Sequence, residues 1–173
     1  MRRPYFPAGD YYRPVRNAIT AGRRHGNDRA AMIALMRRYA GGKRSANYSA
    51  VANGWLAYVR EISDTCSVRP RTGRWRTGQA TIRVTPDLVV EYPDGSVDAV
   101  KLHLNMAPVE PDSAAAMLWL MWETRRESHP GAKPVVLDVR RGTRHTTIPR
   151  GQDYRRRLEA EAKSLASRYG QVA

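Results

Sequence analysis

Apolar residues recur at helical spacing in the first part of the chain. Asn27 and Asp28 can cap a helix that Gly41 and Gly42 end, and its apolar positions are Met32, Leu35, Met36 and Tyr39. A second helix is predicted from the stripe Tyr48, Val51, Ala52, Trp55, Leu56, Val59 and Ile62. Both stripes are typical of helices that pack against a core.

The spacing changes from helical to alternating after a polar stretch at residues 63 to 78, which predicts a loop. Strands are predicted at 81 to 85, 88 to 92 and 97 to 104, with the turn Tyr92-Pro93-Asp94-Gly95 between the last two. One face of this strand pair is expected to carry Asp87, Val89 and Glu91 beside Ala99, Lys101 and His103.

Helices and strands continue to alternate in the last third of the chain. A helix is predicted at 112 to 127, a strand at 134 to 141, a hairpin through Gly142 and a basic helix at 152 to 169. This order predicts an α/β (α+β) fold with a mixed central sheet flanked by helices. We expect a single domain, residues 27–173, after a basic N-terminal arm, residues 1–26, with a short helix near 13 to 22.

The charge balance points to a polyanionic partner. Thirty Lys and Arg against sixteen Asp and Glu give a formal net charge of +14 and a pI near 10.7. Such a charge favours nucleic acid as the partner, and we expect DNA rather than RNA. The alternative explanation of the high arginine content is a GC-biased genome, since only four of the thirty basic residues are lysines.

No stretch approaches the roughly 18 apolar residues of a membrane span, so no membrane partner is expected. The basic N-terminus is not followed by the hydrophobic region of a signal peptide, which predicts a cytoplasmic protein. Cys66 is the only cysteine, which excludes an intramolecular disulfide and a cysteine-based zinc cluster.

Two short motifs lie on the neighbouring strands: Pro86-Asp87, and Ala99-Val100-Lys101. Their position resembles the PD-(D/E)xK nuclease superfamily, in which Pro-Asp at one strand faces an acid-x-Lys triplet on the next. The resemblance covers roughly residues 45 to 169. It implies a restriction-endonuclease-like α-β-β-β-α-β core of the RecB type, with extra N-terminal helices, and a metal-dependent nuclease acting on DNA.

The same resemblance implies that Asp87 binds a Mg²⁺ cofactor and that Lys101 positions the nucleophile. The chain departs from the motif at Ala99, where the family has an acid. The candidates to replace that acid are Glu61 near the end of the preceding helix, which we expect to complete the site, and also Asp98 and Glu91. The alternative is a catalytically inactive protein in which Asp87 and Lys101 form a cross-strand ion pair.

Two arginine-rich segments are candidates for nucleic-acid binding. The first, in the predicted loop, contains Arg69, Arg71, Arg74, Trp75 and Arg76, and the second, around the Gly142 hairpin, contains Arg140, Arg141 and Arg144. Arginine can contact phosphates, and Trp75 either stacks on a base or packs onto the core. The sequence thus predicts a nucleic-acid-binding protein of nuclease-like fold, with a non-cleaving binding or scaffold subunit as the alternative. A homodimer or a larger assembly is open in both cases.

Overall fold

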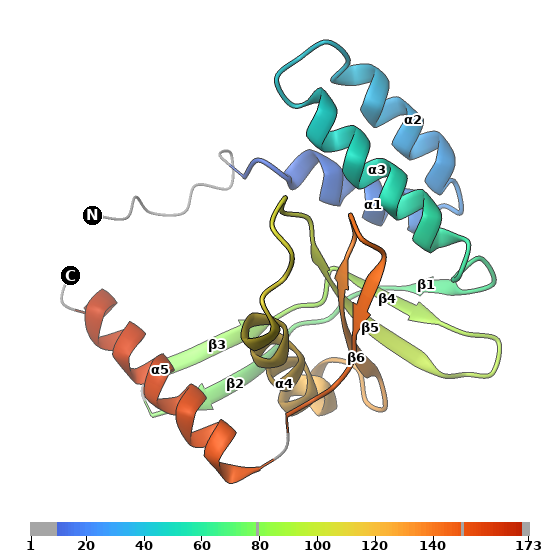
Figure 1. Cartoon of the computed structure of the whole chain (residues 1–173). Helices are drawn as coiled ribbons and strands as arrows, with labels where there is room; N and C mark the ends of the chain where they lie inside the picture. Colours follow the sequence, from blue (N-terminus) through green and yellow to red (C-terminus); the bar gives the residue numbers. More distant parts are fainter. Residues whose placement is uncertain (1–9, 79, 150, 171–173) are drawn as a thin grey trace.

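The computed structural model describes residues 10–78, 80–149 and 151–170. It is a mixed α/β structure (Figure 1). In chain order the elements are α1 (Arg13–Arg24), α2 (Asp28–Arg38), α3 (Ser45–Val59), β1 (Cys66–Val68), β2 (Gly73–Thr77), β3 (Ala80–Val84), β4 (Leu88–Glu91), β5 (Val97–His103), α4 (Pro111–Ser128), β6 (Lys133–Asp138), β7 (Thr143–His145) and α5 (Gln152–Gly170). None of the described helices combines the length and apolar character needed to cross a membrane.

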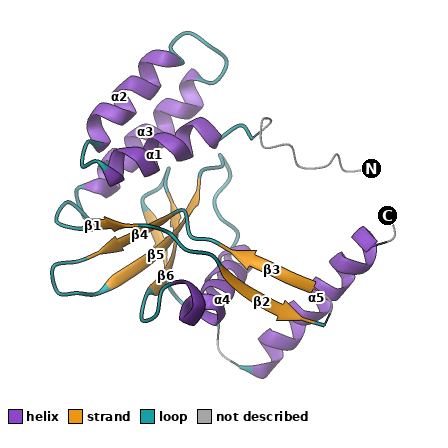
Figure 2. Ribbon diagram, turned by 180° about the vertical axis from the view of Figure 1, so that it is seen from behind, coloured by secondary structure: helices purple, strands orange, loops and turns teal. Residues whose placement is uncertain are grey.

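The main sheet has the strand order β1-β4-β5-β6-β7. β4 pairs antiparallel with β1 and β5, whereas β5 and β6 are parallel and are connected through α4. β2 and β3 pair antiparallel as a separate two-stranded sheet, which we call the ribbon (Figure 2). The main sheet is therefore mixed and flanked by helices, as the sequence predicts.

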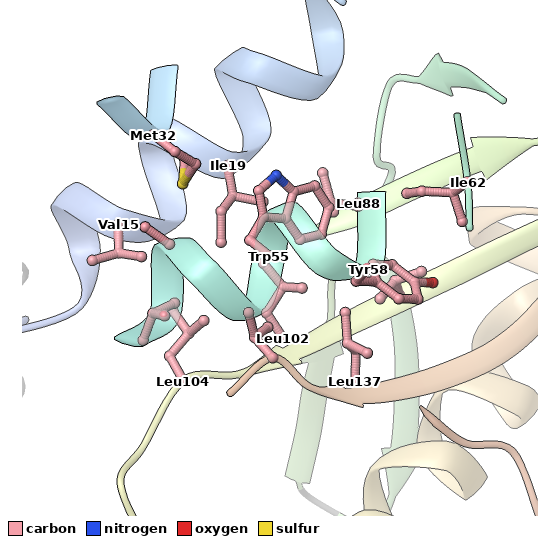
Figure 3. Close-up of a cluster of buried hydrophobic side chains, with 14 of the residues drawn as sticks. Val15, Ile19, Met32, Trp55, Tyr58, Ile62, Leu88, Leu102, Leu104 and Leu137 are labelled. Atoms are coloured by element: carbon pink, nitrogen blue, oxygen red, sulfur yellow. The ribbon is translucent and has the colours of Figure 1, made fainter. Parts of the chain in front are cut away.

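Helices α1, α2 and α3 cover one face of the main sheet (Figures 1 and 2). Their apolar stripes meet the even-numbered positions of β4 and β5 and the odd-numbered positions of β6. In the cluster of Figure 3, Val15, Ile19, Met32, Trp55, Tyr58 and Ile62 pack with Leu88, Leu102, Leu104 and Leu137. A buried carboxylate fixes the helices to one another, because Asp28 accepts a hydrogen bond from the Trp55 indole nitrogen at 3.1 Å.

Helix α1 belongs to this core, although the sequence placed its residues in a basic arm with a short helix. Val15 and Ile19 are 0% exposed. Only these two large apolar side chains of α1 are buried, among four arginines. The short helix was therefore predicted, whereas its composition hid that it docks on the core through two buried side chains. The rest of the predicted arm, residues 1–9, lies outside the described residues.

Helix α4 packs on the opposite face of the main sheet. Leu118 contacts Val136 of β6, and Met121 contacts Ala99 of β5. The outer side of α4 carries the ribbon and α5 through a second apolar cluster, in which Trp119 meets Trp75 and Leu158. The protein thus has helices on both faces of the sheet and the ribbon packed on α4.

The segment predicted as a loop, residues 63–78, contains β1 and β2. β1 has three residues at the edge of the main sheet, and β2 alternates buried and exposed residues from Gly73 to Thr77. The outward positions of β2 are arginines and its inward positions are small residues and one tryptophan. The pattern therefore resembles a polar loop although it follows the alternation of a strand.

Candidate functional site

The strand pair β4–β5 places Asp87 and Lys101 side by side. The pair is closed by the predicted turn, in which the Gly95 N–H donates to the Tyr92 carbonyl at 2.9 Å and Gly95 has a φ of +80°. Leu88 pairs with Val100, and the Asp87 N–H donates to the Val100 carbonyl at 2.8 Å. Lys101 follows Val100, so alternation directs its side chain to the α4 face of the sheet. Asp87 lies just before β4, at the end of the strand next to Lys101.

The Asp87 carboxylate is held by several donors. Its Oδ1 lies 3.3 Å from the Lys101 Nζ, and its Oδ2 accepts the Leu102 N–H at 2.9 Å. The side chain is only 8% exposed. The Lys101 ammonium also donates to the Thr85 carbonyl at 3.2 Å, at the end of the ribbon. Sequence reasoning predicted this pair, because strand alternation and the turn determine it locally.

A second cation, Arg16 of α1, reaches Asp87. The Arg16 Nε lies 3.3 Å from the Asp87 Oδ1, and its Nη1 donates to the Asp10 carboxylate at 2.8 Å. Sequence reasoning missed Arg16, because only the docking of α1 against the sheet brings the two residues together. Asp87 therefore lies between two cations, with no acid beside it from β5.

Ala99 occupies the position at which the resemblance would place the second acid. It is 8% exposed and contacts Val84, Met121 and Ala132 beneath α4. These neighbours are apolar, so the environment suits alanine and would penalise an unpaired carboxylate.

Glu61 is not brought to Asp87. It is exposed in the turn between α3 and β1. Cys66, the first residue of β1, pairs with Glu91, so this turn lies at the end of β4 that is remote from Asp87. There Glu61 acts on Tyr58, whose pKa is raised to about 12, mainly by burial.

The other substitutes also lie elsewhere. Asp98 is paired with Val90 in regular register, so it faces the helices α1 to α3 and not the side of Lys101. It is 4% exposed and accepts hydrogen bonds from Arg144 at 2.6 Å and from the Tyr92 hydroxyl at 3.0 Å. Glu91 is exposed at the far end of β4.

One further carboxylate, Asp138 of β6, faces the same side of the sheet as Lys101. Its register partner is His103, which places it two strands and two residues from Asp87, or about 12 Å by ordinary sheet spacings. Its carboxylate is engaged by the Arg141 guanidinium at 3.1 Å. This separation is too large for the two acids to share one ion.

The residues present do not fit the Mg²⁺ cofactor that the resemblance implies. Mg²⁺ in proteins takes oxygen ligands and is held through one or two carboxylates together with substrate oxygens. Here Asp87 is bonded to two cations and a backbone N–H, and the acid that Arg16 links to it, Asp10, is itself bonded to the Arg16 guanidinium. Across the described residues no group of three or more His, Cys, Asp or Glu could hold a metal ion.

Four of the predicted nucleic-acid contacts precede or form the ribbon, and all four are exposed: Arg69, Arg71, Arg74 and Arg76. Arg74 lies directly opposite Arg83 of β3, which is also exposed. Sequence reasoning did not include Arg83 among the binding residues, although its outward position follows from the predicted alternation at 81–85. Glu127 of α4 accepts hydrogen bonds from the backbone N–H and the guanidinium of Arg74. These bonds, the backbone one first, lower the pKa of the Glu127 carboxyl.

Trp75 points inward and packs onto the core, the second of the two expectations. It is 5% exposed, and its ring meets the Trp119 ring edge-on with centroids 5.3 Å apart. Stacking on a base would require Trp75 to leave this cluster, so the structure removes it from the nucleic-acid contacts.

The three arginines around Gly142 make internal contacts. Arg140 donates to the Leu104 carbonyl at 3.1 Å and to the Asn47 side chain at 2.9 Å. Arg141 bonds Asp138, and Arg144 bonds Asp98. These contacts link β5, β6 and α3, so the structure gives the three guanidinium groups a structural role where the sequence suggested phosphate contacts.

No protein-family model, no curated protein and no solved structure matches the chain.

Proposed function

We propose that this chain is a nucleic-acid-binding protein with a nuclease-like fold that binds without cleaving. The observation that carries the proposal is the exposed arginine surface at residues 69–76 of a chain with a net charge of +14. Such a surface neutralises phosphates and gives sequence-independent affinity.

The element order supports a restriction-endonuclease-like core. α3 precedes β1, β4 and β5 form the antiparallel hairpin, and α4 connects β5 to the parallel strand β6. This is the α-β-β-β-α-β order that the resemblance implies, with the ribbon inserted between β1 and β4.

Binding is tested by fluorescence anisotropy of the purified protein with labelled DNA and RNA over a range of salt concentrations. We expect binding at low salt whose log K falls linearly with log salt, with a slope of about −0.9 for each phosphate neutralised on duplex DNA. Affinity that does not change with salt would contradict the phosphate contacts. Failure to bind any nucleic acid at low salt would overturn the proposal and leave a scaffold role.

The second candidate, a metal-dependent nuclease, is favoured by one observation, the 3.3 Å approach of Lys101 to Asp87. The two candidates separate in an assay of supercoiled plasmid with Mg²⁺ or Mn²⁺. We expect no nicking above that of the Asp87→Asn variant, which keeps the size and one acceptor of the side chain. Cleavage by the wild type that Asp87→Asn abolishes would establish the nuclease instead.

A further inference from the structure

The ribbon has one apolar face and one basic face. Alternation turns Trp75, Ile82 and Val84 towards α4 and α5. The opposite face carries Arg74, Arg76, Thr81 and Arg83, all exposed. Of these positions Arg74 is paired with Arg83, and Arg76 with Thr81.

This arrangement of charges is only partly compensated within the chain. Like charges directly opposite each other destabilise a strand pair, and Arg74 faces Arg83 in this way. Arg74 is compensated by Glu127. The Arg76 charge also contributes to lowering the pKa of Glu127, but within the described part of the chain neither Arg76 nor Arg83 forms an ion pair. The outer face therefore carries excess positive charge, which an external anion would stabilise.

The inner face holds the ribbon firmly in place. A Cβ on Gly73 would lie 2.6 Å from the Thr124 side chain, which shows how closely β2 approaches α4. Trp75 and Trp119 add an aromatic contact beside Leu158 and Ala162 of α5. The arginines are thus presented by a preorganised element, and little entropy is lost when a partner binds.

The shape and composition of the outer face select the form of nucleic acid. The major groove of B-DNA is about 12 Å wide and admits a two-stranded ribbon, whereas the minor groove is about 6 Å wide. The major groove of duplex RNA is deep and narrow. Proteins that bind single-stranded nucleic acid stack bases on aromatic side chains. The aromatic residue of this ribbon, Trp75, is buried.

We propose that the outer face of the β2–β3 ribbon binds in the major groove of duplex DNA. The inference rests on the proposed function and names both the surface and the form of nucleic acid. Each strand of five residues is about 17 Å long and would follow about five base pairs, with Arg76 and Arg83 contacting phosphates or base edges.

The test compares two variants that each remove two exposed arginines. Arg76→Ala with Arg83→Ala removes the two ribbon charges that form no ion pair among the described residues. Arg29→Ala with Arg37→Ala removes the same charge from α2, on the other side of the main sheet. Anisotropy with a labelled duplex should show the ribbon variant weakened at least about tenfold, with its salt slope smaller by about two. The α2 variant should stay within about threefold of wild type.

Thermal unfolding separates binding from folding. The ribbon variant should unfold at or above the wild-type temperature, because it removes a repulsive pair. Affinity of the ribbon variant equal to that of the α2 variant would overturn the inference while nucleic-acid binding by the wild type stands. Absence of wild-type binding to any probe would overturn the proposed function itself.

The form of nucleic acid is tested with the wild type and three probes of one sequence. Duplex DNA should bind more tightly than single-stranded DNA and duplex RNA. Methylation of guanine N7, an acceptor in the major groove, should weaken binding. Tighter binding to either other probe, or no effect of N7 methylation, would contradict the placement in the major groove.

Discussion

At the scale of the residue, one substitution decides what the central carboxylate can do. Asp87 and Lys101 have the geometry of a catalytic pair, but Ala99 contributes no second acid, and Arg16 contributes a second cation. A carboxylate bonded to two cations and a backbone N–H has three of its about four acceptor sites occupied. Asp87 therefore acts as a connection between α1 and the β4–β5 hairpin.

Asp87→Asn is expected to destabilise the protein by about 2 kcal/mol, because Arg16 and Lys101 lose their common partner while the Leu102 N–H keeps an acceptor. Urea unfolding measures the effect. Glu91→Gln, which changes the net charge equally at the exposed end of the same strand, should cost under about 0.5 kcal/mol. Equal costs for the two variants would mean that the ion pairs contribute nothing specific.

His129 gives the fold a pH dependence. Its Nε2 accepts the Arg71 N–H at 2.9 Å, which requires the neutral ring, and burial together with the nearby Arg71 charge lowers its pKa below 6.5. The unfolded chain thus binds a proton that the folded chain does not, so this contribution is present above pH 6.5 and lost as pH falls through the folded pKa. Urea unfolding at neutral and acidic pH should show that the free energy of unfolding falls less with acidification for His129→Gln than for wild type. An identical loss would exclude His129 as its source.

At the scale of the element, the spacing of apolar residues predicted the helices and most strands, but it did not predict how these elements dock against one another. The strands β3, β4 and β5 and the turn between the last two follow from alternation within a few residues. β1 and β2 were missed, because a three-residue edge strand and an arginine-rich strand have no apolar signature. Their pairing and burial depend on β4 and α4.

The approach of α3 to the sheet depends on Gly54. A Cβ at this position would lie 2.0 Å from the Val139 carbonyl oxygen, just after β6. Gly54→Ala should therefore destabilise by about 3 kcal/mol, opposite in sign to the gain of about 1 kcal/mol expected in an exposed helix. Chemical denaturation measures the free energy of unfolding of this variant. Gly42→Ala is the control, because a Cβ at that position would make only ordinary contacts. A stabilised Gly54→Ala protein would contradict this packing.

At the scale of the whole molecule, apolar layers on both faces of the main sheet hold together a chain with a large positive charge. α1 to α3 fill one face and α4 the other, while the ribbon and α5 extend the core beyond α4. Net charge of this size opposes compaction through self-repulsion, so internal ion pairs and apolar contacts between distant segments must offset it.

Two such contacts come from α1. The double variant Val15→Ala with Ile19→Ala is expected to destabilise by about 4 kcal/mol or more, since both side chains are fully buried. Asn17→Ala, on the exposed side of the same helix, should cost under about 0.5 kcal/mol. Urea unfolding that gives the double variant wild-type stability would restore the interpretation of residues 13–24 as a detachable arm.

The features that depend on neighbouring residues follow from the sequence. These are the order of helices and strands in most of the chain, the mixed α/β class and the cross-strand meeting of Asp87 and Lys101. The side chains that face inward across elements were established by the packing of the folded chain. It buried Trp75 against α4, engaged Arg140, Arg141 and Arg144 internally, and brought Arg16 to Asp87. The physical reason is that these contacts join segments far apart in the chain, which local periodicity does not encode.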